Sequence, residues 1–373
     1  MNDTEYMQRA LELASRGRHA TRPNPMVGAV VVRDGHVVGE GWHQQAGGPH
    51  AEVFALRAAG AQARGATLYV TLEPCSHTGK TPPCADLLIR SGVRRVVCAM
   101  QDPFDAVNGQ GIRRLQAAGI SVTVGVLETQ ARCLNRGYLS VIQRHRPYIV
   151  GKWAMTLDGK TATVGGESQW ITGASSRIDA HRLRARADAV AVGIGTVLAD
   201  NPRLTVRHGD TSRQPLCVVW DTHARIPPES RLLQERADET VVLVGIESNF
   251  DKQDAIRATG ATVLALPLSA DGRIDTASAL QALATEWAVQ ELMVEGGAVL
   301  LGELLDRDYL DEIVTYIAPT AFGGTQAKGA TAGKGVIRLA EARRYTITDI
   351  ARCGSDVRLT YTRGREEDIC SQD

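Results

Sequence analysis

Short apolar runs alternate with helical segments along almost the whole chain, and this alternation restricts the fold more than any other feature. In the first half, the apolar spacing predicts strands at 27–32, 36–41, 66–71, 93–100 and 120–124 and helices at 3–17, 51–59, 84–91 and 109–118. Asp34-Gly35 between the first two runs indicates a hairpin. Strands that alternate with helices form a helix-covered sheet, here largely parallel after the hairpin, so the predicted fold class is α/β.

The pattern is interrupted at a charged stretch that ends in a proline, Gln143-Arg144-His145-Arg146-Pro147. A second alternating segment follows, with strands expected at 148–155, 189–193, 216–221, 240–244, 262–265, 291–294 and 311–317 and helices at 175–186, 280–290 and 298–305. Each half is long enough to bury a hydrophobic core of its own. We therefore predict two domains, residues 1–145 and 147–373.

Charge and composition limit the partners that the chain can have. Lys plus Arg and Asp plus Glu each number 42, so the net charge is zero and gives no general attraction to nucleic acid or to an anionic membrane. The longest apolar run, 189–199, is shorter than the ~18 residues that a membrane-spanning helix needs. The first residues lack the basic and apolar regions of a signal peptide, and only Cys75 and Cys84 of the seven cysteines are close in sequence. We expect a cytoplasmic protein that binds neither nucleic acid nor membrane.

Three residues of the first half have the chemistry of a zinc site. His50 precedes a predicted helix, Cys75 follows a predicted strand and Cys84 opens the next helix. One imidazole and two thiolates suit Zn²⁺, and three protein ligands leave the fourth tetrahedral position for water, as a catalytic site requires. Glu52 can hold a proton beside that water. The set matches the His-x-Glu…Pro-Cys-x-x-Cys signature of zinc nucleobase deaminases, except that residues 76–83 separate the cysteines.

The long interval between the cysteines leaves alternatives open. His77 lies within it and is either a rival ligand or a residue of a substrate-binding loop. Either cysteine alone could be a small buried core residue. If His77 were a fourth ligand, the site would be closed, which indicates a structural zinc scaffold that presents an interaction surface.

The second half carries weaker local signals. Gly193 and Gly195 begin a dinucleotide-binding fingerprint, but Leu198 occupies the position of its third glycine, so the pattern does not support a Rossmann fold. Gly296 and Gly297 follow an apolar strand and precede a helix, where backbone N–H groups can approach a phosphate. Such glycines are equally common as ordinary turn residues.

Longer motifs resemble a known family. Pro23-Asn24-Pro25-Met26-Val27-Gly28, His50-Ala51-Glu52-Val53 and the stretch from Glu73 to Cys84 are similar to the deaminase half of the bifunctional riboflavin-biosynthesis deaminase–reductases, which shares the long interval between cysteines. The resemblance implies a cytidine-deaminase-like zinc domain that hydrolytically deaminates 2,5-diamino-6-(5-phosphoribosylamino)pyrimidin-4(3H)-one, with Glu52 as the catalytic residue. It places Asn24 against the pyrimidine, although an asparagine between two prolines is also a common turn residue.

The second half resembles the reductase half of the same family, which has a dihydrofolate-reductase-like fold. The resemblance is carried by Lys152-Trp153-Ala154-Met155-Thr156-Leu157-Asp158-Gly159-Lys160, Gly195-Thr196, Asp200-Asn201-Pro202-Arg203-Leu204-Thr205 and Val294-Glu295-Gly296-Gly297. It implies NADPH-dependent reduction of the ribosyl group of 5-amino-6-(5-phosphoribosylamino)uracil to ribityl. It places NADPH against Ala154, Trp170, Thr196, Asp200, Thr222, Gly296 and Gly297. It places substrate against Ser168, Arg184, Leu204, Arg207 and Glu295. Lys152 is a separate candidate to touch the reacting sugar.

Two of these positions have a physical argument of their own. Arg184 and Arg207 supply the planar, charged donors that the substrate's phosphate needs. Thr222 departs from the family pattern, which has a smaller hydroxyl residue after Asp221.

We expect a homo-oligomeric enzyme with both activities, a hydrolase and an oxidoreductase acting on a phosphoribosylaminopyrimidine. The alternative is a nucleic-acid or nucleoside zinc deaminase with a non-catalytic, nucleotide-binding second domain.

Overall fold

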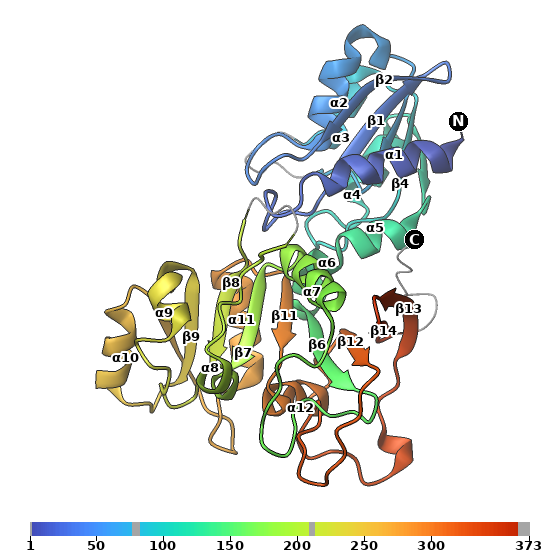
Figure 1. Cartoon of the computed structure of the whole chain (residues 1–373). Coiled ribbons are helices and arrows are strands. Elements are labelled where there is room, and N and C mark those ends of the chain that lie inside the picture. The colour runs from blue at the N-terminus through green and yellow to red at the C-terminus, as the bar shows by residue number, and fades with distance from the viewer. Residues whose placement is uncertain (1, 77–82, 209–212, 365–373) are drawn as a thin grey trace. The chain divides into compact units, whose positions relative to one another are not determined.

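The computed structural model describes residues 2–76, 83–208 and 213–364 (Figure 1). The chain forms two compact units, residues 1–145 and 146–373, and each is described by itself. Among the described residues, none of the helices combines the length and the apolarity that a membrane crossing needs.

The first unit has a five-stranded sheet between two layers of helices. Its strands are β1 (Gly28–Arg33), β2 (His36–Trp42), β3 (Thr67–Val70), β4 (Arg95–Cys98) and β5 (Ser121–Val124), in the order β2-β1-β3-β4-β5. β1 is antiparallel to β2 and β3, whereas β3, β4 and β5 are parallel. The helices are α1 (Asp3–Ser15), α2 (Ala51–Ala59), η1 (Gly60–Ala63), α3 (Cys84–Ser91), α4 (Gln110–Ala117), α5 (Glu128–Leu134) and α6 (Arg136–Arg144).

Successive strand residues of this unit point to opposite faces and so fill two cores. On β1, Ala29 and Val31 pack with α2, α3 and α4, while Val30 and Val32 pack with α1, α5 and α6. A strand that is buried on both faces reads as a continuous apolar run, as β1 does.

The second unit is a nine-stranded sheet in the order β10-β9-β8-β7-β11-β6-β12-β14-β13. The strands from β10 to β12 are parallel, and β14 and β13 close one edge antiparallel. The strands are β6 (Tyr148–Thr156), β7 (Ala189–Gly193), β8 (Leu216–Trp220), β9 (Thr240–Gly245), β10 (Thr262–Leu266), β11 (Glu291–Glu295), β12 (Glu312–Ala318), β13 (Thr346–Cys353) and β14 (Asp356–Thr362).

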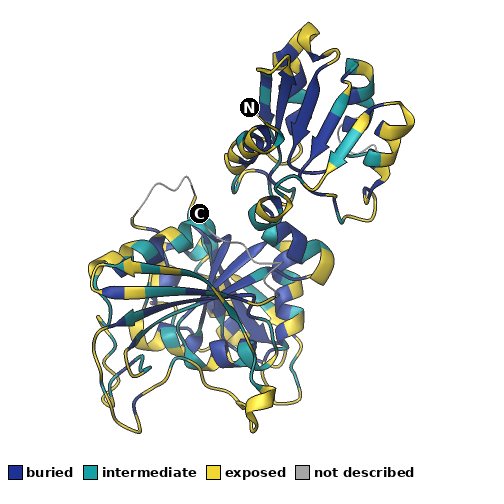
Figure 2. Cartoon of the chain, turned by 90° about the vertical axis from the view of Figure 1, so that its right-hand side faces the viewer, coloured by how far each residue is buried: buried dark blue, intermediate teal, exposed yellow. Residues whose placement is uncertain are grey.

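Helices cover both faces of this sheet, whose central strands are buried (Figure 2). The apolar residues of α11 and α12 fill the core on one face, and those of α8, α9 and α10 fill the core on the other. The helices are α7 (Ala174–Arg186), α8 (Ile194–Asp200), α9 (Arg231–Glu235), η2 (Ala237–Glu239), α10 (Phe250–Arg257), α11 (Thr276–Glu286), α12 (Ala298–Asp306) and η3 (Leu339–Glu341).

The predicted α/β class is confirmed, and the predicted strands and helices of the first half occur within two residues of their expected ends. The interpretation of residues 143–147 as a charged linker was partly wrong, because α6 continues through Arg144. This helix also buries Tyr138 and Leu139. The helix expected at 280–290 begins earlier, because the side chain of Asp275 accepts a hydrogen bond from the Ser278 N–H and caps it. The prediction missed α5, α8, α9, α10 and the hairpin of β13 and β14.

Candidate active sites

The first site lies where segments after β2 and β3 meet the beginning of α3. His50 immediately precedes α2, Cys75 follows β3, and Cys84 is the first residue of α3. Close packing of α2 on β2 positions His50, since a Cβ on Gly41 would lie 2.6 Å from the Ala51 carbonyl oxygen. The chain segment that carries His50 is therefore held by packing.

Glu73 anchors the loop that carries Cys75. Its buried carboxylate accepts hydrogen bonds from the backbone N–H groups of Asp102 (3.3 Å), Gly109 (2.9 Å) and Ile112 (3.1 Å). The last two lie at the N-terminal end of α4, where a carboxylate is stabilised by the free N–H groups of the helix. The glutamate of the Glu-Pro-Cys motif therefore has a structural function.

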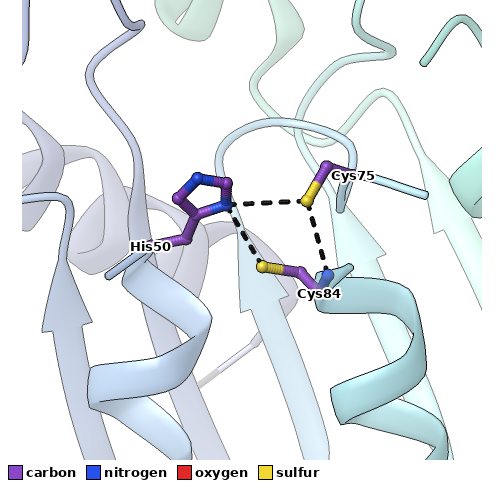
Figure 3. Close-up of side chains that lie close together, drawn as sticks. All are labelled: His50, Cys75 and Cys84. Carbon is purple, nitrogen blue, oxygen red and sulfur yellow. Dashed lines mark hydrogen bonds between the residues drawn. The ribbon is translucent and has the colours of Figure 1, made fainter. Parts of the chain in front are cut away.

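The ligand atoms of the first site converge (Figure 3). Nδ1 of His50 lies 3.3 Å from the Cys84 Sγ and 3.6 Å from the Cys75 Sγ, and the three atoms lie within 4.8 Å of one another. The hydrogen bond with the neighbouring Cys84 thiol lowers the pKa of Cys75. Burial acts in the opposite direction, and His50 lowers this pKa further. One imidazole nitrogen and two sulfurs this close can bind a single tetrahedral zinc and leave one position open.

Glu52 lies beside these ligands on the first turn of α2. Its side chain is buried, with 3% exposed, and burial raises its pKa. Its Oε2 has no hydrogen-bond partner among the described residues. Because an unpaired buried carboxylate oxygen is costly, this atom fits a site that receives a metal and its water.

A cavity of about 340 Å³ adjoins Glu52 and the ligands. In its wall, His43 has Nδ1 3.0 Å from the Pro49 carbonyl oxygen and Nε2 3.1 Å from the Asn24 side-chain nitrogen. With the ring proton on Nδ1, His43 donates to Pro49 and accepts from Asn24. The amide oxygen of Asn24 is then available to a ligand.

The second site lies at the carboxyl end of β11, where Glu295 is opposite Lys152 in the middle of β6. Arg184 of α7 donates hydrogen bonds to both oxygens of Glu295, and Lys152 Nζ lies 3.6 Å from Glu295 Oε2. Burial alone would raise the pKa of Glu295, but Arg184 and Lys152 lower it to about 2. The carboxyl ends of parallel strands are the usual place for ligands in such sheets.

The turn from β11 into α12 fits a phosphate-bearing cofactor. Gly296 and Gly297 have φ of +61° and +76°, and a Cβ on Gly297 would lie 3.1 Å from Thr196 Oγ1 of α8. The missing side chains leave a cradle at a helix N-terminus. Ala154, two residues beyond Lys152 on β6, shares its face of the sheet.

The other predicted contacts to NADPH lie on three further segments of the second unit. Trp170 is exposed, with the Arg177 guanidinium 4.7 Å from its ring centroid, and Asp200 is the last residue of α8. Thr222 follows β8, and its carbonyl accepts from the Gly245 N–H.

The two predicted substrate contacts Ser168 and Leu204 differ in how far their side chains are exposed. Ser168 is half-buried. Leu204 has its side chain in the core and a φ of +53°, so only its backbone can face a ligand. His77 lies outside the described residues.

Known proteins resemble the chain over nearly its whole length. Residues 147–359 match the RibD C-terminal domain, and residues 1–100 match the cytidine and deoxycytidylate deaminase zinc-binding region. The riboflavin biosynthesis protein RibD of Escherichia coli (strain K12) is 43% identical over 96% of this chain and 99% of that protein. The chain belongs to the RibD family. RibD of Aquifex aeolicus (strain VF5) is likewise 43% identical, over 97% of this chain and 98% of that protein.

Solved RibD structures have the same fold. Acinetobacter baumannii RibD superimposes with a TM-score of 0.86 at 38% identity, over 97% of this chain and 99% of that chain. A Thermotoga maritima protein, described as a diaminohydroxyphosphoribosylaminopyrimidine deaminase/5-amino-6-(5-phosphoribosylamino)uracil reductase, gives 0.83 at 34% identity and the same coverage. The chain therefore combines a cytidine-deaminase-like zinc domain with a reductase domain of the RibD family.

RibD membership confirms the predicted function at the level of the family. The chain is a bifunctional deaminase and reductase of riboflavin biosynthesis, acts on small molecules, and uses zinc and NADPH. The alternative of a deaminase with a non-catalytic second half is wrong, because that half is the RibD reductase domain.

Several residues that line the deaminase cavity were not predicted from the sequence. His43 and Asp102 carry polar groups there, and Phe104, Tyr138 and Ile142 supply apolar surface. The Tyr138 hydroxyl donates to Asp102 Oδ1 at 3.0 Å, which joins α6 to the segment after β4. Tyr138 and Ile142 lie four positions apart on one face of α6. This spacing could have predicted the helix, but residues 143–147 were interpreted as a linker.

Proposed function

We propose that residues 1–145 deaminate 2,5-diamino-6-(5-phosphoribosylamino)pyrimidin-4(3H)-one, with His50, Cys75 and Cys84 as the zinc ligands. The observation that carries this proposal is the buried Oε2 of Glu52, which has no hydrogen-bond partner in the described part of the chain and lies beside the three converging ligand atoms. Zinc, when bound, supplies the Lewis acidity that makes water a nucleophile at neutral pH.

Glu52 and Asn24 have distinct tasks in this step. Glu52 accepts the proton of the attacking water and delivers it to the departing amino group, for which a raised pKa is suitable. Asn24 accepts a hydrogen bond from the pyrimidine through its amide oxygen, because His43 engages its nitrogen. The burial of Glu52 excludes competing water from the proton transfer.

We further propose that residues 147–373 reduce the ribosyl group of 5-amino-6-(5-phosphoribosylamino)uracil to ribityl. NADPH, when bound, supplies the hydride. The residues that hold it are Ala154, Trp170, Thr196, Asp200, Thr222, Gly296 and Gly297. The residues that hold the substrate are Lys152, Ser168, Arg184, Leu204, Arg207 and Glu295.

Within this second site, Arg184 and Arg207 have different functions. Arg184 holds Glu295 through both carboxylate oxygens, so it orients that carboxylate. Arg207 is exposed, and its guanidinium donates to the Thr205 hydroxyl and to no carboxylate among the described residues, which suits it to the substrate's phosphate.

A fragment that begins at Arg146 tests this division of the chain. The compactness of the second unit supports its independent folding. We expect the fragment to melt cooperatively and to oxidise NADPH with the deaminated substrate in the absence of zinc. A folded, NADPH-binding fragment without turnover would show that residues before the boundary complete the reductase site.

We propose that the enzyme is a homo-oligomer that associates through the edge strand β13. A bulge between Ile347 and Asp349 places Ile347 and Ile350 on one face, where they are 51% and 65% exposed. An edge strand with exposed isoleucines favours pairing with a second copy. Light scattering should give a multiple of the chain mass for the native protein and a lower mass for Ile350→Lys.

We also propose a cytoplasmic location. Among the described residues, Cys75, Cys84, Cys98, Cys217 and Cys353 are free thiols, as is usual in a reducing compartment. Cell fractionation with an antibody to the chain tests this, and enrichment in an oxidising compartment would contradict it.

A further inference from the structure

Three side chains hold the backbone of residues 205–207, the segment that presents Arg207. Arg184 Nη1 donates to the Thr205 carbonyl at 2.9 Å. Gln214 bonds both backbone groups of Val206, at 2.7 and 3.1 Å. The N–H of Arg207 itself donates to Nδ1 of a histidine, His181, at 3.3 Å.

His181 has no part in the functions assigned so far. It lies on α7, three residues before Arg184, with 6% of its surface exposed. Because a backbone N–H donates to its Nδ1, that nitrogen must carry a lone pair, and the ring proton belongs on Nε2. A doubly protonated imidazolium would have no acceptor and would repel the Arg207 N–H.

The surroundings of His181 keep the ring neutral. Arg184 lies on the same helix, Arg207 and His208 lie on the facing segment, and Glu295 at the end of β11 is the carboxylate that acts against them. Burial, followed by Arg184, Arg207 and His208, lowers the pKa of His181 to about 4. The acceptor that Arg207 requires is therefore present throughout the neutral range.

We propose that His181 is a positioning residue of the reductase: its Nδ1 fixes the backbone of Arg207 so that the guanidinium meets the substrate's phosphate. The proposal rests on the function of Arg207 proposed above. The guanidinium is held from its own side as well, since Nη1 donates to Thr205 Oγ1 at 3.0 Å. With both its backbone and its guanidinium tethered, Arg207 binds phosphate with less loss of side-chain entropy.

Three variants of His181 in the full-length enzyme separate this function from simple packing. His181→Asn keeps an acceptor near the position of Nδ1, His181→Gln moves its amide toward the position of Nε2, and His181→Phe keeps the ring without an acceptor. We expect the Phe and Gln variants to raise the KM for the phosphorylated reductase substrate about tenfold, with kcat within about twofold. His181→Asn should restore the native KM, and the KM for NADPH should not change in any of them.

Two comparisons make the result decisive. A substrate analogue without the phosphate should be reduced equally well by the native enzyme and by His181→Gln. If Arg207→Ala raises the substrate KM but the Gln and Phe variants do not, the proposal for His181 is wrong and the function of Arg207 stands. If Arg207→Ala leaves the KM unchanged, the proposed function of Arg207 fails first. If the KM rises equally in His181→Asn, or rises equally for the unphosphorylated analogue, His181 is merely a structural residue. The comparison of His181→Asn with His181→Gln decides this question even if the Phe variant does not fold.

Discussion

Arg184 of α7 donates hydrogen bonds to both carboxylate oxygens of Glu295, the last residue of β11. Lys152 faces the same carboxylate from β6, so one buried carboxylate is the shared counter-charge of two half-buried cations. Removing the anion leaves both cations without a counter-charge, which is more costly than losing an exposed ion pair. This carboxylate therefore stabilises the reductase site as well as shaping it.

The first prediction concerns the pH dependence of that stabilisation. The pKa of Glu295 is lowered from 4.5 to about 2 in the folded state, so its contribution, roughly 3 kcal/mol, is fully present above pH 4.5 and is lost as the pH falls toward 2. Glu295→Gln should lower the free energy of unfolding above pH 4.5, and the difference from the native protein should shrink below it. Tryptophan fluorescence measures the unfolding of the second unit, since Trp153, Trp170, Trp220 and Trp287 lie in it.

The matched control is Glu235→Gln, which removes an exposed carboxylate that pairs with Arg203. It should leave the unfolding curve close to the native one at every pH. The same loss in both variants would contradict the special position of Glu295.

The second prediction concerns the metal. Cys75→Ala should lose zinc and deamination together, because two remaining ligands cannot hold a stable site. Cys98→Ala is the control, since that thiol is buried on β4 away from the ligand set, and it should keep one zinc per chain. Metal analysis of the purified variants gives the answer. Stoichiometric zinc in both Cys75→Ala and Cys84→Ala would refute the ligand assignment.

The third prediction separates proton transfer from metal binding. Glu52→Gln is nearly isosteric but cannot accept a proton, so zinc content should stay native while deamination falls by about 10²–10⁴-fold. Glu128→Gln, an exposed carboxylate elsewhere in the same unit, should deaminate normally. Deamination by Glu52→Gln at the native rate would show that another group carries the proton.

The fourth prediction concerns the phosphate. Arg207→Ala should raise the reductase KM for its phosphorylated substrate about 10–100-fold, the loss expected for a charge-assisted hydrogen bond, and leave NADPH affinity near native. Arg203→Ala removes the same charge from an arginine that pairs with Glu235, and its KM should stay within about twofold. A KM raised only for NADPH would assign Arg207 to the cofactor instead.

The zinc ligands could be predicted from the sequence because their chemistry is local. An imidazole and two thiols in segments of a few residues, each at the end of a predicted element, already suggest convergence. The α/β class followed in the same way from the alternation of strands and helices.

His43 and His181 could not be found in this way, because their functions depend on contacts between distant segments. His43 reaches Asn24 across the end of β2, and His181 meets Arg207, 26 residues further along the chain. Tyr138 was missed because the charges around α6 concealed its apolar face. Such functions depend on tertiary contacts, which local sequence patterns do not predict.

Product analysis of the full-length enzyme with 2,5-diamino-6-(5-phosphoribosylamino)pyrimidin-4(3H)-one tests the central claim most directly. Without NADPH, mass spectrometry should find one product, in which an amino group of the ring has been replaced by oxygen, together with released ammonia. With NADPH, it should find that product carrying two further hydrogens on the sugar chain. Reduction of the diamino substrate before its deamination, or deamination without any reduction when NADPH is present, would contradict the account of two successive activities on one chain.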